Sequence, residues 1–352
     1  MANVKSTEPT VRDVAMLAEV SPATVTRVLS KSDYPVRAHV RQRVLEAAEM
    51  LAYTPRSRRG ASMSNKSTLV SVIIPNISNP FYQEATISLQ RDLESSGFEV
   101  IICNTFRRAE KDREYLATMF KMGVRGVILS ASTDEKDIIS YYIDKGMKFV
   151  LLDQVVFDED LCPRINADIL NGVFLAVEHL IQNGHRKIAY ISTPLVRWSR
   201  QVVFEGFVNA LMQSNIEFPN EYLLLDDNDD EFAESSYEYR SGFKLAQEFL
   251  KRGLDATAVV VINDMTAIGT IQGFTSQGVR VPEDVSVVSF DNTFFSEQFK
   301  PELTTIGFPA HEIGRLAAQI LSDQMKNNES RPMTIKMQPK LVVRNTVRNL
   351  NA

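Results

Sequence analysis

The chain has 352 residues, of which 44% are hydrophobic, so it is long and apolar enough to bury the cores of two or three folded units. Its N-terminus lacks the apolar stretch of a secretory signal, and no run reaches the roughly 18 apolar residues that a membrane helix needs. We therefore expect a cytoplasmic protein with no membrane partner. The two cysteines exclude a disulfide framework, and Cys103, in the run FEVIICN, is expected to be a small buried residue.

The net charge of −5 conceals an uneven distribution of charge along the chain. Residues 1–66 contain eleven Lys and Arg against six Asp and Glu, or about +5, so the remaining residues sum to about −10. A basic N-terminal segment ahead of an acidic remainder indicates a polyanionic partner for that segment alone. A basic surface without a partner is the alternative that charge by itself leaves open.

Two short helices are predicted in the basic segment. Thr10 and Asp13 have the spacing of a capping box, with Asp in place of the usual Glu. The apolar residues of the first helix repeat on one face, at Val11, Val14, Ala15 and Ala18. Ser21 then supplies a second N-cap and Pro22 occupies the first helical position, where its missing N–H costs nothing. This second helix is expected to end at about Leu29.

The second helix has an apolar and a polar face. Its inward residues are Val25, Val28 and Leu29. A third helix that covers the first two is predicted from the apolar pattern Val40, Val44, Ala47 and Leu51. Two helices joined by a tight turn, with a third packed across them, form a helix-turn-helix, whose second helix can enter the major groove of DNA.

The polar face of the second helix carries groups suited to contact DNA. Next to Pro22, Ala23 can touch a thymine methyl, and Arg27 can donate two hydrogen bonds to O6 and N7 of guanine. The hydroxyl groups expected to hold phosphates are those of Ser21, Thr24 and Thr26. The alternative is a three-helix scaffold with a merely solvated polar face.

From Leu69 onward, short β-rich runs alternate with helical patterns. The first series contains LVSVIIP, a helix over 81–96, FEVIICN, a helix from Glu110, GVILS, a helix from Asp134, and KFVLLD. A second series begins near Asn171 and contains KIAYIS, EYLLL, TAVVVIN and VSVVSF. The chain is expected to return to the first lobe near Thr304. Such alternation predicts an α/β fold with parallel sheets flanked by helices.

The sequence closely resembles the LacI/GalR repressors. The head of that family is matched by TVRDVAMLAEVSPATVTRVLS followed by VRAHVRQRVLEAAEMLAYTP. The likeness continues, in the family's order, through VSVIIPNISNPFY and VEHLIQNGHRKIAYIS to QPKLVVRNTV. It implies a helix-turn-helix domain over 1–55, a hinge over 56–68, and a two-lobed, periplasmic-binding-protein-like core over 69–352 for effector binding and dimerisation.

The hinge, RSRRGASMSNKS, is basic and small and has no apolar period. In the family this segment forms a short helix on DNA and inserts a leucine into the minor groove. Ser62 stands at the position of that leucine, so Met63 could replace it. Alternatively, the three arginines Arg56, Arg58 and Arg59 could hold the backbone or a narrow minor groove, or supply only charge in a flexible linker.

Ligands of such sheets bind beyond the carboxyl ends of the strands. By resemblance, Phe81 is the aromatic residue that lies against the effector, although it could equally be a core residue. Arg197, Trp198 and Ser199 follow the strand KIAYIS, where the family binds sugar hydroxyls or a base, with packing as the rival role of the single tryptophan. Strand ends also place Asn263 and Asp291 in the candidate effector site.

Asp291 matches the aspartate that the family places in its ligand cleft, where a carboxylate accepts hydroxyl or N–H donors. For the neighbouring Asp264, capping of the next helix is the favoured role. The family's arginine in this region is replaced by Val203, for which Arg200 or Gln201 could substitute. The acidic run over 226–231 lacks the features of a calcium loop and is predicted to be a solvated turn, which would disfavour phosphorylated ligands if it borders the cleft.

An enzyme is not indicated by the sequence. The first strand ends in PNISNP instead of a nucleotide-binding glycine pattern, and no metal or triad spacing involves His39, His179, His185 or His311. No cofactor is expected. A transport binding protein would share the two lobes but would carry a signal peptide and no helix-turn-helix.

We expect a ligand-responsive repressor that binds a palindromic operator in double-stranded DNA as a homodimer. No leucine heptads follow LVVRNTV, so a tetramer has no visible basis. The resemblance implies that a sugar is the leading effector and that the repressor controls carbohydrate-utilisation genes. A nucleobase-like corepressor or a protein coregulator is the alternative.

Overall fold

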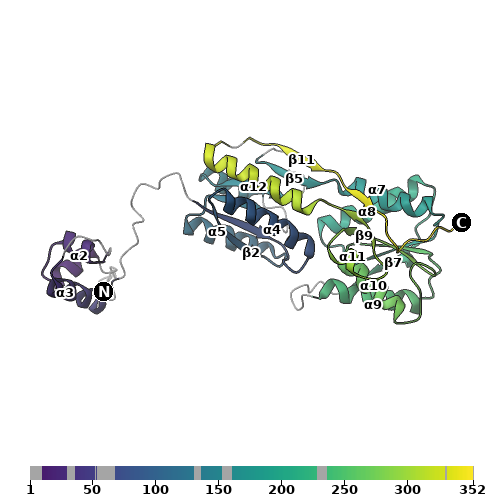
Figure 1. Cartoon of the computed structure of the whole chain (residues 1–352), viewed down its shortest axis with the longest axis horizontal. Helices are drawn as coiled ribbons and strands as arrows, with labels where there is room; N and C mark the ends of the chain where they lie inside the picture. The colour runs from purple at the N-terminus through teal and green to yellow at the C-terminus, as the bar shows by residue number, and fades with distance from the viewer. Residues whose placement is uncertain are drawn as a thin grey trace, which may run out of the picture. The chain divides into compact units, whose positions relative to one another are not determined.

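The chain divides into two units, residues 1–65 and 66–352, and each has its own hydrophobic core. The computed structural model describes residues 10–29, 36–51, 53, 68–130, 136–152, 161–227, 236–329 and 331–351 (Figure 1).

The first unit contains three helices, α1 (Val11–Leu17), α2 (Pro22–Leu29) and α3 (Ala38–Met50). The backbone N–H of Thr10 donates to Oδ2 of Asp13 at 2.7 Å, as the capping-box spacing predicts. The buried core of the unit consists of Val14, Ala15, Ala18, Val25, Val28, Val44, Ala47 and Ala48. The predicted apolar faces of all three helices are therefore confirmed, except at Val40, which is not part of this core.

The start of α2 is fixed by Ser21. Its Oγ accepts a hydrogen bond from the backbone N–H of Thr24 at 3.2 Å, and Pro22 is the first helical residue. Glu19, in the turn before α2, has a φ of 52°, which is the left-handed region. The chain therefore reverses between α1 and α2 within a few residues, as a helix-turn-helix requires.

The second unit has two lobes, each built on a six-stranded sheet. The first sheet is entirely parallel, with the order β11-β5-β4-β3-β1-β2. Its strands are β1 (Leu69–Ile74), β2 (Glu99–Asn104), β3 (Gly126–Leu129), β4 (Lys148–Leu152), β5 (Arg164–Ala167) and β11 (Thr334–Met337). The helices of this lobe are α4 (Pro80–Ser95), α5 (Ala109–Met122), α6 (Lys136–Asp144) and α12 (Ala310–Asn327).

The second sheet has the order β12-β10-β9-β8-β6-β7, and only β12 is antiparallel to its neighbour. Its strands are β6 (Ile188–Ser192), β7 (Leu223–Leu225), β8 (Ala258–Val261), β9 (Ser286–Asp291), β10 (Thr304–Gly307) and β12 (Lys340–Val342). The helices of this lobe are α7 (Ile169–Gln182), α8 (Trp198–Gln213), α9 (Tyr237–Lys251), α10 (Asp264–Thr275), α11 (Phe295–Gln298) and the 3-10 helix η1 (Asn220–Tyr222).

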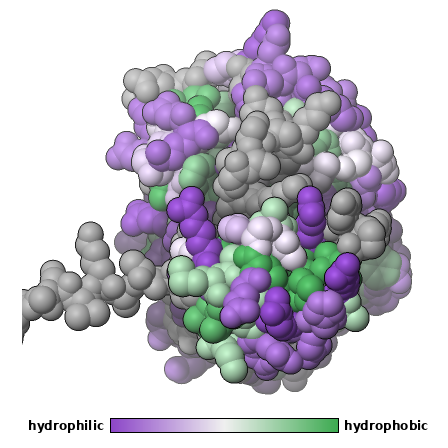
Figure 2. Space-filling model, turned by 90° about the vertical axis from the view of Figure 1, so that its left-hand side faces the viewer, coloured by the Kyte–Doolittle hydropathy of each residue, from purple (hydrophilic) through white to green (hydrophobic). Residues whose placement is uncertain are grey.

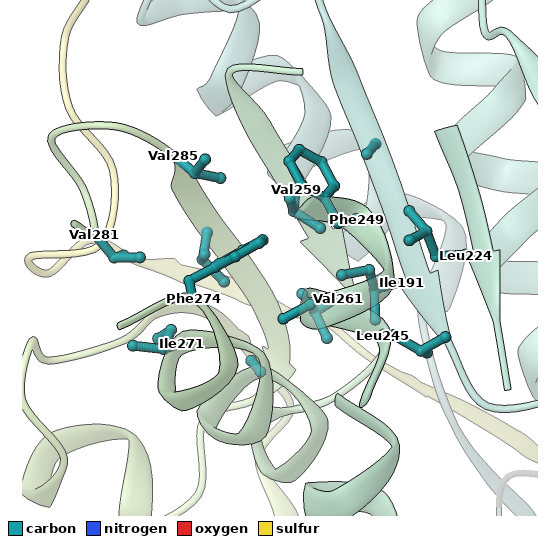
Figure 3. Packing of buried hydrophobic residues seen from close by; sticks show 14 of the residues in the cluster. Ile191, Leu224, Leu245, Phe249, Val259, Val261, Ile271, Phe274, Val281 and Val285 are labelled. Carbon is teal, nitrogen blue, oxygen red and sulfur yellow. The ribbon is translucent and has the colours of Figure 1, made fainter. Parts of the chain in front are cut away.

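Both faces of the second sheet are buried, because side chains alternate along each strand. On β8, Val259 and Val261 face α9 and α10, whereas Ala258 and Val260 face α7 and α8. Figure 3 shows the first of these cores, with Phe249 of α9 and Phe274 of α10 packed against the strands. The two-sided burial confirms the predicted α/β arrangement.

The prediction that the chain returns to the first lobe near Thr304 is wrong by several residues. Thr304–Gly307 is strand β10, which pairs with β9 in the second sheet, with Thr305 opposite Ser289. These β-rich residues are buried as a strand, and the return occurs only at α12. The chain then enters the first sheet as β11 and the second as β12.

Helices α9 and α10 approach each other at the level of their backbones. A Cβ atom at Gly242 would lie 1.9 Å from the carbonyl oxygen of Thr266, and one at Gly269 would lie 1.9 Å from that of Tyr239. Any larger residue would separate the helices. The two glycines thus hold the first two turns of α9 against the first two turns of α10.

Hydrophobic side chains also reach the surface. The face in Figure 2 mixes hydrophilic and hydrophobic residues, with the larger green areas in its lower half. In the first unit the exposed large hydrophobic residues are Met16, Leu17, Leu45 and Met50. Exposure of this kind is common in folded proteins and does not by itself mark a site.

Candidate functional site

The outer face of α2 is exposed where DNA contacts are predicted. Pro22, Ala23, Thr26 and Arg27 are exposed, and Val25 and Val28 are buried on the opposite side. The face therefore presents a methyl group, a hydroxyl and a guanidinium within two turns of helix. These are groups that can contact base edges in the major groove.

The three hydroxyls predicted to contact phosphates are already engaged in local hydrogen bonds. Ser21 Oγ and Thr24 Oγ1 are 2.9 Å apart, and Thr26 Oγ1 donates to the carbonyl oxygen of Pro22 at 3.0 Å. The hydroxyl hydrogen of Thr26 is thus used within the helix. Contact of Thr26 with a phosphate stays a prediction and would require its side chain to rotate.

The predicted hinge contacts fall outside the described residues. They are Arg56, Arg58, Arg59, Ser62 and Met63.

At the carboxyl edge of the second sheet, Asn263 and Asp291, which the sequence placed at separate strand ends, lie beside Thr193, which it did not single out. The register pairs Ile191 with Val261, and Val260 with Val288. When this register is continued, Thr193, Asn263 and Asp291 lie at one level on three neighbouring strands. The edge therefore combines a hydroxyl, an amide and a carboxylate.

Two of these side chains are buried with unsatisfied polar atoms. Thr193 is 1% exposed and Asn263 is 2% exposed. Neither Thr193 Oγ1 nor Asn263 Nδ2 has a hydrogen-bond partner in the described part of the chain. Buried polar atoms are almost always paired in folded proteins, so this edge is a candidate binding surface.

Helix α10 is capped by Asn263, and not by Asp264 as the sequence suggested. Asn263 Oδ1 accepts from the backbone N–H of Thr266 at 2.9 Å. Asp264 is the first residue of α10 and is completely buried. Its carboxylate accepts hydrogen bonds from Ser289, Thr293 and Thr305. The sequence pointed to Asp264 as the cap because these three donors lie far from it along the chain and could not be recognised as its partners.

Asp291 ends β9 in an unusual backbone conformation. Its φ is 107°, and that of Asn292 is 55°. Burial, together with the negative charges of Asp264 and Glu238, raises the pKa of Asp291 well above its ordinary value. The charges of Arg200 and Arg107 oppose this shift. A strained, electrostatically perturbed carboxylate at a strand end is typical of a functional position.

A buried ion pair lies close to Asp291. Arg200, in the first turn of α8, donates through Nη2 to Oε1 of Glu238 at 2.9 Å, and each side chain is 8% exposed. Oε2 of Glu238 accepts from Nδ2 of Asn79 at 3.3 Å. Because Asn79 caps α4 in the first lobe, Glu238 connects the two lobes.

Arg107 adds a first-lobe charge to this region. It follows β2, and its guanidinium lies 5.8 Å from the ring centroid of Tyr82. Phe106 and Arg107 have φ values of 51° and 60°, so both lie in the left-handed region. We use the name interlobe site for Asn79 and Arg107 of the first lobe with Thr193, Arg200, Glu238, Asn263 and Asp291 of the second.

Sequence reasoning missed four members of this site: Glu238, Asn79, Arg107 and Thr193. Asn79 could have been found, since it directly follows a predicted strand end. Glu238 offered only the signal of a carboxylate in the first turn of a helix. Val203 is buried in the core between α8 and the sheet, and Arg200, one turn earlier, supplies the arginine.

The other predicted effector residues lie in two places. Phe81 is 9% exposed and packs in the core of the first lobe, with its ring 5.4 Å from that of Tyr82. Arg197, Trp198 and Ser199 form the N-cap and first turn of α8 beside Arg200, and Trp198 is 36% exposed. Contact of these residues with an effector stays a prediction.

The acidic run is not a simple solvated turn. Asp226 is buried and accepts hydrogen bonds from Ser241 and Lys244, so the prediction is wrong for this residue. Lys244 also pairs with Asp227 at 2.6 Å, and the rest of the run lies outside the described residues. Within the described ranges, no cluster of three or more His, Cys, Asp or Glu could hold a metal ion.

Both cysteines are buried and unbridged, so Cys103 is the small buried residue that was predicted. Among the helices that the structure describes, none has the length and apolarity to span a membrane.

Two family models match the chain. The model of the bacterial regulatory proteins of the lacI family covers residues 10–56, and that of the periplasmic binding protein-like domain covers 177–347. The HTH-type transcriptional repressor PurR of Mannheimia succiniciproducens is 30% identical over 346 residues, which are 97% of this chain and 99% of that protein.

Solved structures show the same likeness. The lac repressor dimer bound to operator and the anti-inducer ONPF is 25% identical, with a TM-score of 0.69 over 97% of this chain and all of that chain. A LacI family regulator from Enterococcus faecium with bound ribose is 29% identical, with a TM-score of 0.70 over 80% of this chain and 99% of that one.

Proposed function

Because the chain belongs to the lacI family of bacterial regulatory proteins, we propose that it is a ligand-responsive transcriptional repressor that binds a palindromic operator as a homodimer. The observation that carries the proposal is the outer face of α2, where Ala23 and Arg27 are exposed over a helix fixed by the Ser21 cap. Two such helices, one from each subunit, would each enter one half-site of the operator.

The effector of this repressor binds in the interlobe site. Support comes from the buried, unpaired atoms of Thr193 and Asn263 and from the carboxylate of Asp291 at the end of the neighbouring strand. The Enterococcus faecium regulator that this chain resembles holds ribose. A sugar is therefore the first effector class to test, and carbohydrate-utilisation genes are the first candidate targets.

A nucleobase-like corepressor is the second candidate effector. The partly exposed indole of Trp198 beside Arg197 favours it, since flat bases stack on aromatic rings and guanidinium planes. Whichever ligand binds, its contact with both lobes would change the arrangement of the lobes. The hinge would pass this change to the helix-turn-helix domain and so alter the affinity for DNA. Coupling of this type is worth about 1 to 3 kcal/mol and acts in both directions.

The experiment is a thermal-unfolding screen of the full chain against sugars, sugar alcohols, sugar phosphates and nucleobases. A ligand at 100 times its dissociation constant adds about 2.7 kcal/mol to the free energy of unfolding. A stabilising compound is then added to the complex of the chain with DNA. If no compound changes the affinity for the operator, the ligand-responsive part of the proposal fails. If the chain binds no operator in the absence of any compound, the DNA-binding part fails.

A further inference from the structure

Within the interlobe site, the charges of Arg200 and Glu238 compensate each other in a buried ion pair. Both side chains are 8% exposed, and both carboxylate oxygens of Glu238 are used, one by Arg200 and one by Asn79. On the guanidinium, Nε is buried and has no hydrogen-bond partner in the described structure. The pair thus leaves the Nε–H donor of Arg200 for a ligand while the charge of the guanidinium is already compensated.

This pairing decides which charge the site can accept. A buried charge interacts strongly with its surroundings because little water screens it. An anionic ligand would meet the carboxylates of Glu238 and Asp291, which offset the two guanidinium groups of the site, that of Arg200, paired with Glu238 at 2.9 Å, and that of Arg107, whose charge acts on Asp291. The arrangement therefore opposes the entry of phosphate and carboxylate groups.

A hydroxyl group suits the same atoms. Arg200 Nε and Asn263 Nδ2 are unpaired donors, and the carboxylate of Asp291 is an acceptor. A hydroxyl can accept a hydrogen bond from either N–H donor and donate one to the carboxylate. Adjacent hydroxyls on one molecule would therefore satisfy these three groups without adding charge.

We propose that Glu238 sets the charge selectivity of the interlobe site: by neutralising Arg200, it restricts the effector to uncharged, hydroxyl-bearing molecules and excludes phosphorylated or carboxylated ones. This inference rests on the proposed function, since it assumes that the effector binds at this site. The acidic run was the earlier predicted reason for rejecting anions, but its described part pairs with Lys244. Glu238 takes the place of that run in our explanation.

The test uses the full chain, with inorganic phosphate and sulfate as anionic probes. Trp198 is the only tryptophan and lies two residues before Arg200 in α8, so its fluorescence reports on this site. Glu238→Gln keeps one acceptor oxygen for Arg200, gives up the oxygen to which Asn79 donates, and releases the positive charge. Glu248→Gln is the matched control, because Glu248 is a partly exposed carboxylate on the same helix that pairs with Arg252 outside the interlobe site.

Wild type and Glu248→Gln should show no saturable change in fluorescence with either anion. Glu238→Gln should bind both anions at least about tenfold more tightly than wild type, a step of about 1.4 kcal/mol. Adding Arg200→Met to Glu238→Gln should abolish the gain. Tight anion binding by wild type, or no gain in Glu238→Gln, would overturn the proposal.

A reciprocal variant keeps the test decisive if Glu238→Gln does not fold, which cooperative thermal unfolding shows. Arg200→Gln leaves Glu238 and Asp291 without the guanidinium, so this variant should bind calcium more tightly than wild type. An unchanged affinity for calcium would contradict the role of the pair. None of these titrations needs the natural effector, so they are separate from the operator experiments that test the proposed function.

Discussion

The carboxylate of Asp264 accepts a hydrogen bond from the backbone N–H of Thr293 at 2.6 Å. It also accepts from the hydroxyls of Ser289 and Thr305, on β9 and β10. The first turn of α10 therefore fixes the loop that begins with Asp291, the strained carboxylate of the interlobe site. We therefore expect Asp264 to influence effector binding by holding this loop in place.

Asp264→Ala should reduce the free energy of unfolding by about 2 to 4 kcal/mol, because it leaves buried hydroxyl and N–H groups without an acceptor. Urea unfolding at pH 7 measures the loss. The control is Asp284→Ala, which removes only an exposed ion pair with Arg280 and should cost less. Similar losses in both variants would show that the buried carboxylate has no special part in stability.

Asp291→Asn should stabilise the folded chain at neutral pH by about 1 kcal/mol while removing the response to effector. Asparagine tolerates a positive φ and carries no charge beside Asp264 and Glu238. The folded-state pKa of Asp291 lies above 3.8, so the cost of ionising it is absent below pH 3.8 and grows as the pH rises through the folded-state value. Urea unfolding of wild type and variant at pH 5 and pH 8 tests this expectation. A variant that is no more stable than wild type at pH 8 would contradict it.

Arg27→Ala should cost about 1 to 3 kcal/mol on a selected operator and little on random duplex DNA, because a contact to guanine carries sequence information. Fluorescence anisotropy on both duplexes measures the difference. Arg43→Ala on α3, which removes an exposed partner of Glu19, should not alter the preference for operator. Equal losses on both duplexes would assign Arg27 to a phosphate.

Acid should destabilise the second lobe through His185. The imidazole is completely buried between Thr257 Oγ1, at 2.9 Å from Nδ1, and the carbonyl oxygen of Arg348, at 3.2 Å from Nε2. Burial lowers the pKa of His185 below the ordinary 6.5, so its contribution is complete above pH 6.5 and is lost as the pH falls towards the folded-state value.

Urea unfolding of wild type, His185→Gln and the exposed control His311→Gln between pH 7.5 and 5 checks this expectation. His185→Gln should be less stable at pH 7.5 but should lose less stability on acidification. If its dependence on pH matches that of wild type, another group governs the acid sensitivity.

The parts of the structure that the sequence predicted are those governed by local rules. The Ser21 cap, Pro22 and the apolar period of α2 are set within a few residues, and the strand ends at Asn263 and Asp291 follow from the alternation of strands and helices. Glu238 could not be predicted, because its partner Asn79 lies 159 residues away in the other lobe. The role of Asp264 was missed for the same reason, since its donors lie 25 to 41 residues further along.

Operator binding by the full chain tests the central claim most directly. Duplexes selected from a random pool by the wild-type chain are titrated by fluorescence anisotropy, with and without the uncharged compound that most raises the unfolding temperature. We expect a palindromic consensus, two chains per duplex, and an affinity that the compound changes by about 5- to 150-fold, the range of typical allosteric coupling. Selection without a consensus, or an affinity for the consensus that no stabilising compound alters, would contradict a ligand-responsive repressor.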